Sequence, residues 1–358
     1  IDNGLVVLKS YIKDAQDKKL DSLSGEEAFK LHDTYGFPLD LTVEIAEENN
    51  LKVDVDGFNK CMEEQKQTAR ENRKDGSSWD GAESFEIDVD KPTEFIGYDT
   101  LEADGKILAI VTEGEASNEI SKGENGIIVT DKTPFYAEMG GQVGDKGKIT
   151  NGDSNIKVTD TTKDGNGLYY HHVEVTDGKF TVGDTVKLSV CEKCRRAIER
   201  NHSATHLLHK ALKEVLGDHV AQAGSLVTPE RLRFDFTHFE AMTKDELSEA
   251  EKKVNEAILS ALPVTIKELP IDEAKKLGAE AQFGEKYGAV VRVVSMGDYS
   301  IEFCGGCHLK NTAQAGLFKI LSEGGVASGV RRIEAVTGMG VYEYIKSKDS
   351  TIEAIAKN

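Results

Sequence analysis

The chain of 358 residues carries a formal net charge of −19, and 39% of its residues are hydrophobic. These values are typical of a globular protein with two or three domains, and they disfavour a general binder of DNA or other polyanions, although residues 193–200 concentrate basic side chains locally. No apolar run reaches the length of a membrane span, and the first residues lack the apolar core of an export signal. The sequence therefore predicts a cytoplasmic protein without membrane partners.

Cysteine usage also bears on the cellular compartment. The chain has five cysteines: Cys61, Cys191, Cys194, Cys304 and Cys307. They are too few and too oddly numbered for a disulfide framework, so metal binding in a reducing cytosol is the favoured use. The first residue is Ile1 rather than methionine, which predicts a fragment of a longer protein.

Residues 1–85 are predicted to form a helical segment that ends in a linker. Helix-forming stretches at residues 25–35 and 57–74 are separated by Pro38, which interrupts the helical pattern. The polar, glycine-containing stretch 74–84 follows, and its composition is typical of a linker.

Residues 86–190 have the pattern of a small antiparallel β-barrel. Short apolar runs alternate with turns rich in Gly, Asp and Asn, which is typical of consecutive antiparallel strands. The clearest runs are residues 106–111, 125–130, 147–150, 155–160, 167–175 and 184–190.

Residues 191–340 mix helical and strand periods and are predicted to form an α+β core, so the fold class of the whole chain is α+β. The predicted helices are 201–216, which Gly217 stops, and the amphipathic stretch 244–262. The predicted strands are 231–237, 291–296 and 299–303. Residues 341–358 are predicted to begin a C-terminal helix.

Two short motifs far apart in the sequence predict a metal site. His202 and His206 are spaced i, i+4, so on a helix both imidazoles lie on one face about one turn apart. Cys304 and His308 have the same spacing, and the two glycines between them permit the tight turn that a converging thiolate and imidazole need. Because thiolate and imidazole suit zinc, the sequence predicts one Zn²⁺ held by these four side chains.

Three other interpretations of these residues stay open. His209 lies one turn beyond His206 and can replace the first histidine as a ligand. The Cys-x-x-Cys pairs at 191–194 and 304–307 can together form a four-cysteine zinc site. In the simplest alternative, the histidines only cap and pack their helix, and the cysteine motif is only a turn.

The residue after the first histidine limits the chemistry of the site. It is Ser203, where zinc proteases of the His-Glu-x-x-His type carry their general base, so the chain is not such a protease. A nucleophilic Ser203 needs a free histidine, and both neighbouring histidines are predicted ligands. Hydrolysis by a metal-positioned water is therefore the favoured general chemistry.

Several long motifs resemble the editing region of alanyl-tRNA synthetases. They are TPFYAEMGGQVGD (133–145), NHSATHLLHKAL (201–212), QAGSLVTPERLRFDFTH (222–238), FGEKYG (283–288), VRVVSMGDYSIEFCGGCH (291–308) and GVRRIEAVTG (329–338). Upstream, FKLHDTYGFPLDLT (29–42) and MEEQKQTAR (62–70) resemble the end of the tRNA-recognition domain of the same enzymes. The resemblance covers nearly the whole chain in colinear order.

The resemblance implies a domain order and an activity. The implied order is a helical end of the tRNA-recognition domain with a linker (1–85), the β-barrel part of the editing region (86–190), an α+β zinc-binding editing core of the alanyl/threonyl-tRNA synthetase type (191–340) and the start of a C-terminal helix (341–358). The implied activity is an aminoacyl-tRNA deacylase, which hydrolyses the ester of tRNA(Ala) mischarged with serine or glycine. The ATP-dependent aminoacylation domain of an alanine–tRNA ligase has no counterpart here, so no aminoacylation is expected of this chain.

The family's functional positions fall on specific residues of this chain. The zinc ligands implied by the resemblance are His202, His206, Cys304 and His308. Thr205 and Gln222 are implied to line the editing pocket and to select or orient the substrate. Arg331 and Arg332 are candidates for the tRNA acceptor end, on the ground of their charge. The chain departs from the family pattern at Cys307, where threonine or another small residue is common, and at the Cys-x-x-Cys pair 191–194.

The chemistry of alanine explains why such a site is needed. Serine exceeds alanine by one hydroxyl, so a synthetic pocket cannot strongly exclude serine and a second sieve is required. A pocket that hydrogen-bonds the extra hydroxyl rejects alanine, because its buried polar groups would otherwise go unpaired. Glycine has no hydroxyl, so its removal follows from the resemblance alone.

Rival functions remain beside editing within a ligase. A freestanding trans-editing deacylase of the same superfamily is one, although residues 26–74, which are similar to the recognition domain, and the Ile1 start weigh against it. Another is an RNA-binding module with a structural zinc, which metal removal would unfold. A hydrolase of small esters is a third, and it would turn over without tRNA.

Overall fold

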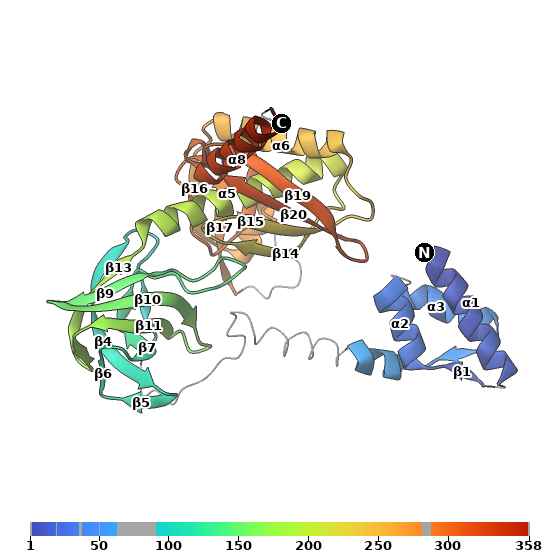
Figure 1. Ribbon diagram of the computed structural model, residues 1–358, viewed down its shortest axis with the longest axis horizontal. Coiled ribbons are helices and arrows are strands. Elements are labelled where there is room, and N and C mark those ends of the chain that lie inside the picture. Colours follow the sequence, from blue (N-terminus) through green and yellow to red (C-terminus); the bar gives the residue numbers. More distant parts are fainter. Residues whose placement is uncertain are drawn as a thin grey trace. The chain divides into compact units, whose positions relative to one another are not determined.

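The computed structural model describes residues 2–18, 20–35, 38–49, 51–62, 91–280 and 288–356. The chain divides into two compact units, residues 1–82 and 83–358 (Figure 1). Across the described residues, no helix is both long and apolar enough to cross a membrane. The predicted linker 74–84 and the residues 63–70 and 283–287 of the family-like motifs lie outside the described residues.

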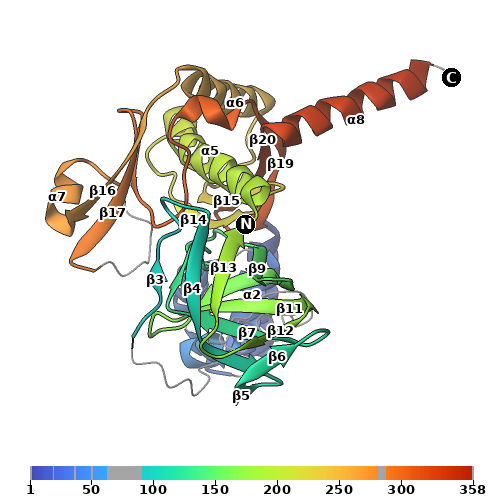
Figure 2. The same cartoon turned by 90° about the vertical axis from the view of Figure 1, so that its left-hand side faces the viewer.

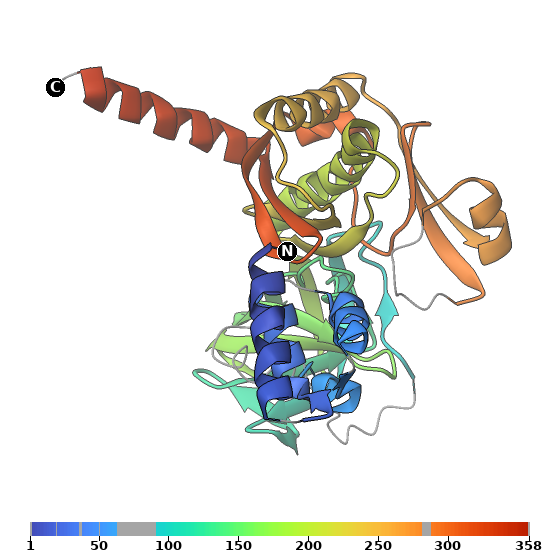
Figure 3. The ribbon, with the colours of Figure 1, turned by 90° about the vertical axis from the view of Figure 1, so that its right-hand side faces the viewer.

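The first unit is helical, as the sequence predicts. Its elements are α1 (Asp2–Asp17), β1 (Ser22–Leu23), α2 (Gly25–Tyr35), α3 (Leu39–Glu48) and β2 (Lys52–Val53), followed by helical residues 55–62. Pro38 is the N-cap of α3, because its missing N–H costs nothing at a helix start. The long α1, dark blue in Figure 3, packs with α2 and α3 around buried Leu8, Ile12 and Leu31.

The second unit begins with the predicted antiparallel barrel. Its strands are β3 (Glu94–Phe95), β4 (Glu102–Thr112), β5 (Glu115–Ser117), β6 (Glu119–Ser121), β7 (Asn125–Thr130), β8 (Lys132–Thr133), β9 (Gly147–Asn151), β10 (Ser154–Lys163), β11 (Tyr169–Asp177), β12 (Lys179–Thr181) and β13 (Thr185–Val190). The sheet order is β13-β9-β10-β11-β7-β4-β5, and pairing of β13 with β4 closes the ring (Figure 2). Closure removes free strand edges from six of these strands.

Alternation along the strands fills the barrel interior. Ile156 and Val158 of β10 and Val186 and Leu188 of β13 are buried in the barrel core, and exposed residues alternate with them. Because side chains at i and i+2 lie on the same face of a strand, this period of two directs one apolar face of each strand inward. Phe135, in the loop after β8, is fully buried among them.

The rest of the unit is the α+β core. Its elements are α5 (Glu192–Leu216), β14 (Gln222–Val227), β15 (Leu232–Thr237), α6 (Lys244–Leu259), β16 (Val264–Pro270), α7 (Ile271–Lys276), β17 (Val290–Met296), β18 (Ser300–Phe303), the 3₁₀ helix η2 (Thr312–Ala315), β19 (Phe318–Ala327), β20 (Val330–Thr337) and α8 (Met339–Ala356). One sheet has the order β14-β15-β20-β19 and another the order β16-β17-β18. The predicted C-terminal helix is α8, which projects away from the core in Figures 2 and 3.

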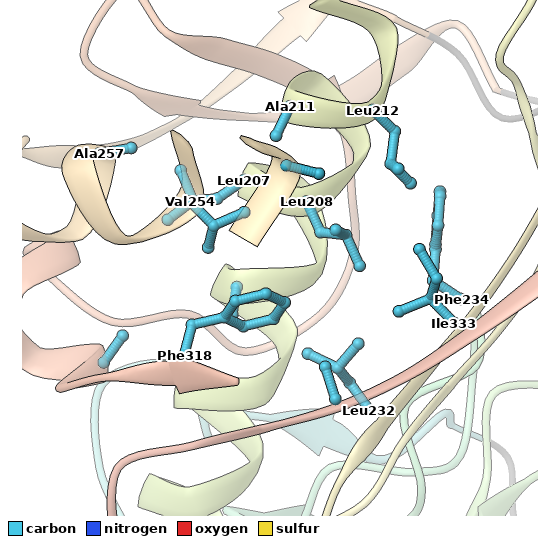
Figure 4. Close-up of a cluster of buried hydrophobic side chains, with 14 of the residues drawn as sticks. Leu207, Leu208, Ala211, Leu212, Leu232, Phe234, Val254, Ala257, Phe318 and Ile333 are labelled. Carbon is cyan, nitrogen blue, oxygen red and sulfur yellow. The ribbon is translucent and has the colours of Figure 1, made fainter. Parts of the chain in front are cut away.

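The main core lies between α5, α6 and the four-stranded sheet. In Figure 4, Leu208 and Leu212 of α5 lie on the side of Phe234 and Ile333, which belong to β15 and β20, and Leu207 lies beside Val254 of α6. All of these side chains are fully buried. Burial of each large apolar side chain contributes about 1.5–3 kcal/mol, so this cluster fixes α5 firmly against the sheet.

α5 is longer than predicted, since it starts at Glu192 instead of residue 201. The extra turns are basic and polar, and their anchor is Arg195, whose side chain is buried against the barrel. Its Nε donates to both carboxylate oxygens of Asp145 at 3.1 Å, and its Nη2 pairs with the same carboxylate. Its other donors bond the carbonyls of Gly97 (2.6 Å) and Pro134 (3.0 Å). This buried ion pair therefore joins the first turn of α5 to the barrel.

Replacing Arg195 with leucine should lower the free energy of unfolding by about 3–5 kcal/mol, because Asp145 would remain as a buried, unpaired charge. Chemical denaturation of the second unit measures the change. The matched control is Arg231→Leu, since Arg231 is half exposed and its ion pair with Glu334 lies at the surface; its cost should be about 0–1 kcal/mol. Equal losses in both variants would contradict the proposed anchoring role.

Candidate metal centre

The two predicted ligand pairs meet in one buried cluster. His202 and His206 lie one turn apart on α5, Cys304 directly follows β18, and His308 lies four residues further on. One ligand atom from each of the four side chains lies within 4.8 Å of every other. Cys304 Sγ is 3.4 Å from His202 Nε2 and 3.2 Å from His308 Nε2. A tetrahedral zinc ion with ordinary bond lengths would need sulfur–nitrogen separations of about 3.5 Å, so the spacing fits such an ion.

The outer nitrogens of all three imidazoles have polar partners. His202 Nδ1 lies 2.8 Å from Gln142 Oε1, and His308 Nδ1 lies 3.2 Å from Ser203 Oγ. His206 Nδ1 lies 2.9 Å from the Glu302 carboxylate. Partners of this kind orient a ligating imidazole and leave Nε2 for the ion. The donor set and its surroundings therefore fit a divalent metal.

The turn that carries Cys304 is held rigidly by its backbone carbonyls. Arg292 of β17 donates to the carbonyls of Cys304 (2.9 Å) and Gly306 (2.7 Å), and its guanidinium lies 4.0 Å from the centre of the Tyr98 ring. The Tyr98 hydroxyl in turn donates to the Gly305 carbonyl at 2.5 Å. A Cβ at Gly306 would overlap the His202 ring, so glycine is required there by close packing rather than by backbone angle.

Charges inside the cluster balance one another. Burial raises the pKa of the Cys304 thiol, but the three histidines around it outweigh burial and hold that pKa well below its usual range. Burial, with His202 nearby, lowers the pKa of His308 to about 3. Burial also lowers the pKa of His206, but Glu302 and Cys304 outweigh it and raise the pKa to about 10. The imidazoles around Cys304 thus favour its thiolate form, which is the form that binds a metal.

Glu302 connects the cluster to a neighbouring histidine. Burial raises the pKa of Glu302, but His206 and His209 outweigh it and hold the pKa below its usual range. His209 does not join the cluster: its Nδ1 lies 3.0 Å from Glu302 Oε1, on the side of a polar cavity of about 140 Å³ that Tyr299 and Glu280 also line. The alternative in which His209 replaces a ligand is therefore wrong for this arrangement.

The cysteines outside the cluster do not form a second metal site among the described residues. Cys191 is the N-cap of α5 and forms a disulfide with Cys194, with a Cα–Cα distance of 5.4 Å. Cys307 is buried, and burial raises the pKa of its thiol to about 12. The four-cysteine alternative is therefore wrong here. The sequence favoured metal binding for the cysteines, but Cys191 and Cys194 form a disulfide instead. The i, i+3 spacing at a helix start brings the two sulfurs together.

Of the two predicted pocket residues, Thr205 lies beside a ligand and Gln222 lies on a strand. Thr205 is buried next to His206, and its hydroxyl donates to the Asn201 carbonyl at 2.9 Å. Gln222 is half-buried at the start of β14, where a bulge separates it from Gly224 in the pairing with β15. Bulges re-aim side chains and are frequent next to active sites.

The two predicted tRNA-contacting arginines lie on β20 and are both engaged in ion pairs. Arg331 binds both oxygens of Glu323 at 2.6 and 2.9 Å. Arg332 binds both oxygens of Asp235 at 2.7 and 2.8 Å, and Asp235 pairs in register with Gly224 of β14. Neither arginine touches the four-ligand cluster. Within the local basic segment 193–200, Arg195 is also unavailable to a phosphate, because it is buried.

Three residues that position the cluster were not identified from the sequence: Gln142, Glu302 and Arg292. Glu302 had a recognisable signal, since it is a charged residue between the apolar Ile301 and Phe303 of a short strand, two residues before Cys304. Gln142 lies in the motif 133–145 that resembles the editing region and was expected beside the pocket, but only the tertiary fold brings its side chain to His202.

Comparisons with known proteins agree with this geometry. Residues 1–194 match the family model described as tRNA synthetases class II (A). The chain is 52% identical to the alanine–tRNA ligase of Acetivibrio thermocellus and 54% identical to that of Clostridioides difficile, in each case over all of this chain. The chain belongs to the alanyl-tRNA synthetase family. Residues 291–334 also match the model of the threonyl and alanyl tRNA synthetase second additional domain, and this segment contains the Cys304 turn and the first part of β20.

The match to these synthetases is partial on their side. The chain spans 41% of the length of both ligases, and 41% of a third, from Pelotomaculum thermopropionicum, to which it is 51% identical. The resemblance inferred from the motifs is thus confirmed at the level of the family.

The geometry predicts about one divalent metal ion per chain, lost in Cys304→Ala and kept in Cys307→Ala. The two cysteines are three residues apart and both buried, but only Cys304 has its sulfur among the imidazoles. Elemental analysis of protein purified without chelator measures the content. Loss of metal from the Cys307 variant alone would show that the ligand set is different.

Proposed function

We propose that the cluster binds one Zn²⁺ and that the second unit hydrolyses the ester that joins serine or glycine to mischarged tRNA(Ala), within an alanine–tRNA ligase of the cytoplasm. The observation that carries this proposal is the convergence of His202 and His206 of α5 with Cys304 and His308, and the latter two lie within residues 291–334, which match the additional domain of threonyl and alanyl tRNA synthetases. No aminoacylation is proposed for this chain, and tRNA(Ala) is its proposed partner.

The proposed zinc would have four protein ligands. A bound ion would hold the two motifs in register and supply positive charge beside the reacting ester. Because the four side chains complete a tetrahedron, the protein must provide substrate recognition from other residues. Thr205 and Gln222 are the proposed readers.

Thr205 is suited to recognise a donor on the substrate. Its own proton is committed to the Asn201 carbonyl, so its oxygen can only accept a further hydrogen bond. The serine hydroxyl and the α-ammonium group are both donors of the kind it would bind. The Gln222 amide can both donate and accept hydrogen bonds, and it makes none to the described part of the chain.

We place the acceptor end of tRNA near Arg331 and Arg332 on the ground of charge. Each guanidinium is already held by two carboxylate oxygens, so a phosphate would have to share it with Glu323 or Asp235. With a net charge of −19, binding of tRNA would depend on such local sites.

Release of labelled amino acid from Ser-tRNA(Ala), with Ala-tRNA(Ala) as control, tests the activity. The zinc-loaded chain should release serine selectively. Cys304→Ala should abolish release because one of the four proposed metal ligands is lost. Turnover of small serine esters without tRNA would favour the small-ester hydrolase. Tight tRNA binding without release would favour an RNA-binding module, and in that case metal removal should unfold the domain.

Gln222→Leu should slow serine release by about tenfold, the cost of one lost hydrogen bond to a buried polar group, and should leave the zinc content unchanged. Single-turnover kinetics on Ser-tRNA(Ala) measure this effect. The control is Gln314→Leu, since Gln314 contacts only the Lys310 backbone at an exposed site. Unchanged kinetics in the Gln222 variant would remove that residue from the recognition of substrate.

A further inference from the structure

Gln142 is a fully buried polar side chain whose position is set by two backbone contacts with the core. It lies in the barrel loop between β8 and β9. Val227 N, at the end of β14, donates to the Gly141 carbonyl at 2.7 Å, and Val143 N donates to the Val227 carbonyl at 3.1 Å. Gly141 has φ +83°, and a Cβ there would strike the Ser225 backbone. Only glycine permits this close approach, so the loop geometry is fixed on both sides of Gln142.

One atom of Gln142 touches both halves of the ligand cluster. Oε1 accepts from the backbone N–H of Cys307 at 2.8 Å and lies 2.8 Å from His202 Nδ1. A backbone N–H can only donate, so the amide atom that faces it must be the carbonyl oxygen. His202 Nδ1 must then carry a proton, because two acceptors would repel. The lone pair of a neutral His202 is therefore on Nε2, the nitrogen that faces Cys304 Sγ.

The His202 ring is also confined sterically. Gly306 packs so closely that a Cβ would overlap the ring and approach Gln142 Oε1. The ring therefore has one orientation in which its proton meets Gln142 and its lone pair meets the cluster. Gln142, His202 and the turn at Gly306 form one interlocked contact between the barrel, α5 and the segment after β18.

We infer that Gln142 is a positioning residue for metal binding: it fixes the tautomer of His202 and the backbone of Cys307, and so ties the metal affinity of the core to the barrel loop. This inference rests on the metal binding proposed above. If Gln142 only filled space, a side chain of similar size without the amide oxygen would support metal binding equally well.

The test compares Gln142→Met, which keeps length but has no acceptor oxygen, with Gln142→Glu, which keeps an acceptor. Thr161→Val is the matched control, because Thr161 is fully buried and its hydroxyl donates to the Asp145 carbonyl of the same loop at 2.9 Å without touching the cluster. Each full chain is stripped of metal and titrated with Co²⁺ in competition with a chelator, with the thiolate–cobalt absorption as the readout. Nitrogen-15 NMR of the histidine rings reports the proton on His202 Nδ1 in the metal-free and zinc-loaded states.

Gln142→Met should bind Co²⁺ about 10–100-fold more weakly, while Gln142→Glu and Thr161→Val should bind as the original chain does. His202 Nδ1 should be protonated in the original chain. Wild-type affinity in the Met variant, or an unprotonated Nδ1, would overturn the inference. If the original chain binds no cobalt, the metal proposal fails. The NMR measurement on the metal-free chain then still tests whether Gln142 fixes the tautomer of His202. If the Met variant does not fold, the Glu variant and the NMR measurement on the original chain decide it.

Discussion

Three imidazoles and a thiolate within 4.8 Å of one another, all buried, set the central constraint on this unit. Desolvated polar groups at such distances are stable only if each proton and each lone pair has a partner. His202 Nδ1 and His308 Nδ1 meet this demand through Gln142 and Ser203, and His206 Nδ1 lies at ion-pair distance from Glu302, so the inner atoms are left to one another or to a shared cation. The rest of the fold can be understood as the scaffold that holds those outer partners in place.

That scaffold works because its three parts are rigid for different reasons. α5 is fixed by apolar burial under α6 and the four-stranded sheet, and by the Arg195–Asp145 ion pair at its first turn. The Cys304 turn is fixed by carbonyl hydrogen bonds from Arg292 and Tyr98. The barrel loop is fixed by a short backbone ladder with Val227. Small shifts in any of them would separate ligands that hydrogen-bond distances now hold together.

Sequence patterns predicted the parts of the site that depend on local periodicity. The i, i+4 spacing of His202 and His206 needs only a helix, and the alternation in β10 and β13 needs only a strand. The strands β14, β16, β19 and β20 were not predicted. β16 is mostly exposed, and β19 contains two glycines near its end, so the apolar pattern of each is weak. The roles of Gln142 and Arg292 were missed for a different reason. Their contacts form only when distant segments of the chain meet, and the local periodicity of a sequence carries no information about such contacts.

The separations in sequence within the cluster have a consequence for how the chain folds. Gln142 must find His202 across 60 residues, His202 must find Cys304 across 102, and Gln142 must meet the Cys307 backbone across 165. Loop closure over such distances is slow and entropically costly before other contacts form. During synthesis the barrel and α5 emerge well before the Cys304 turn. Cys304 and His308 therefore reach the two imidazoles of α5 together, and the ligand set is complete only after the turn that follows β18 has been synthesised.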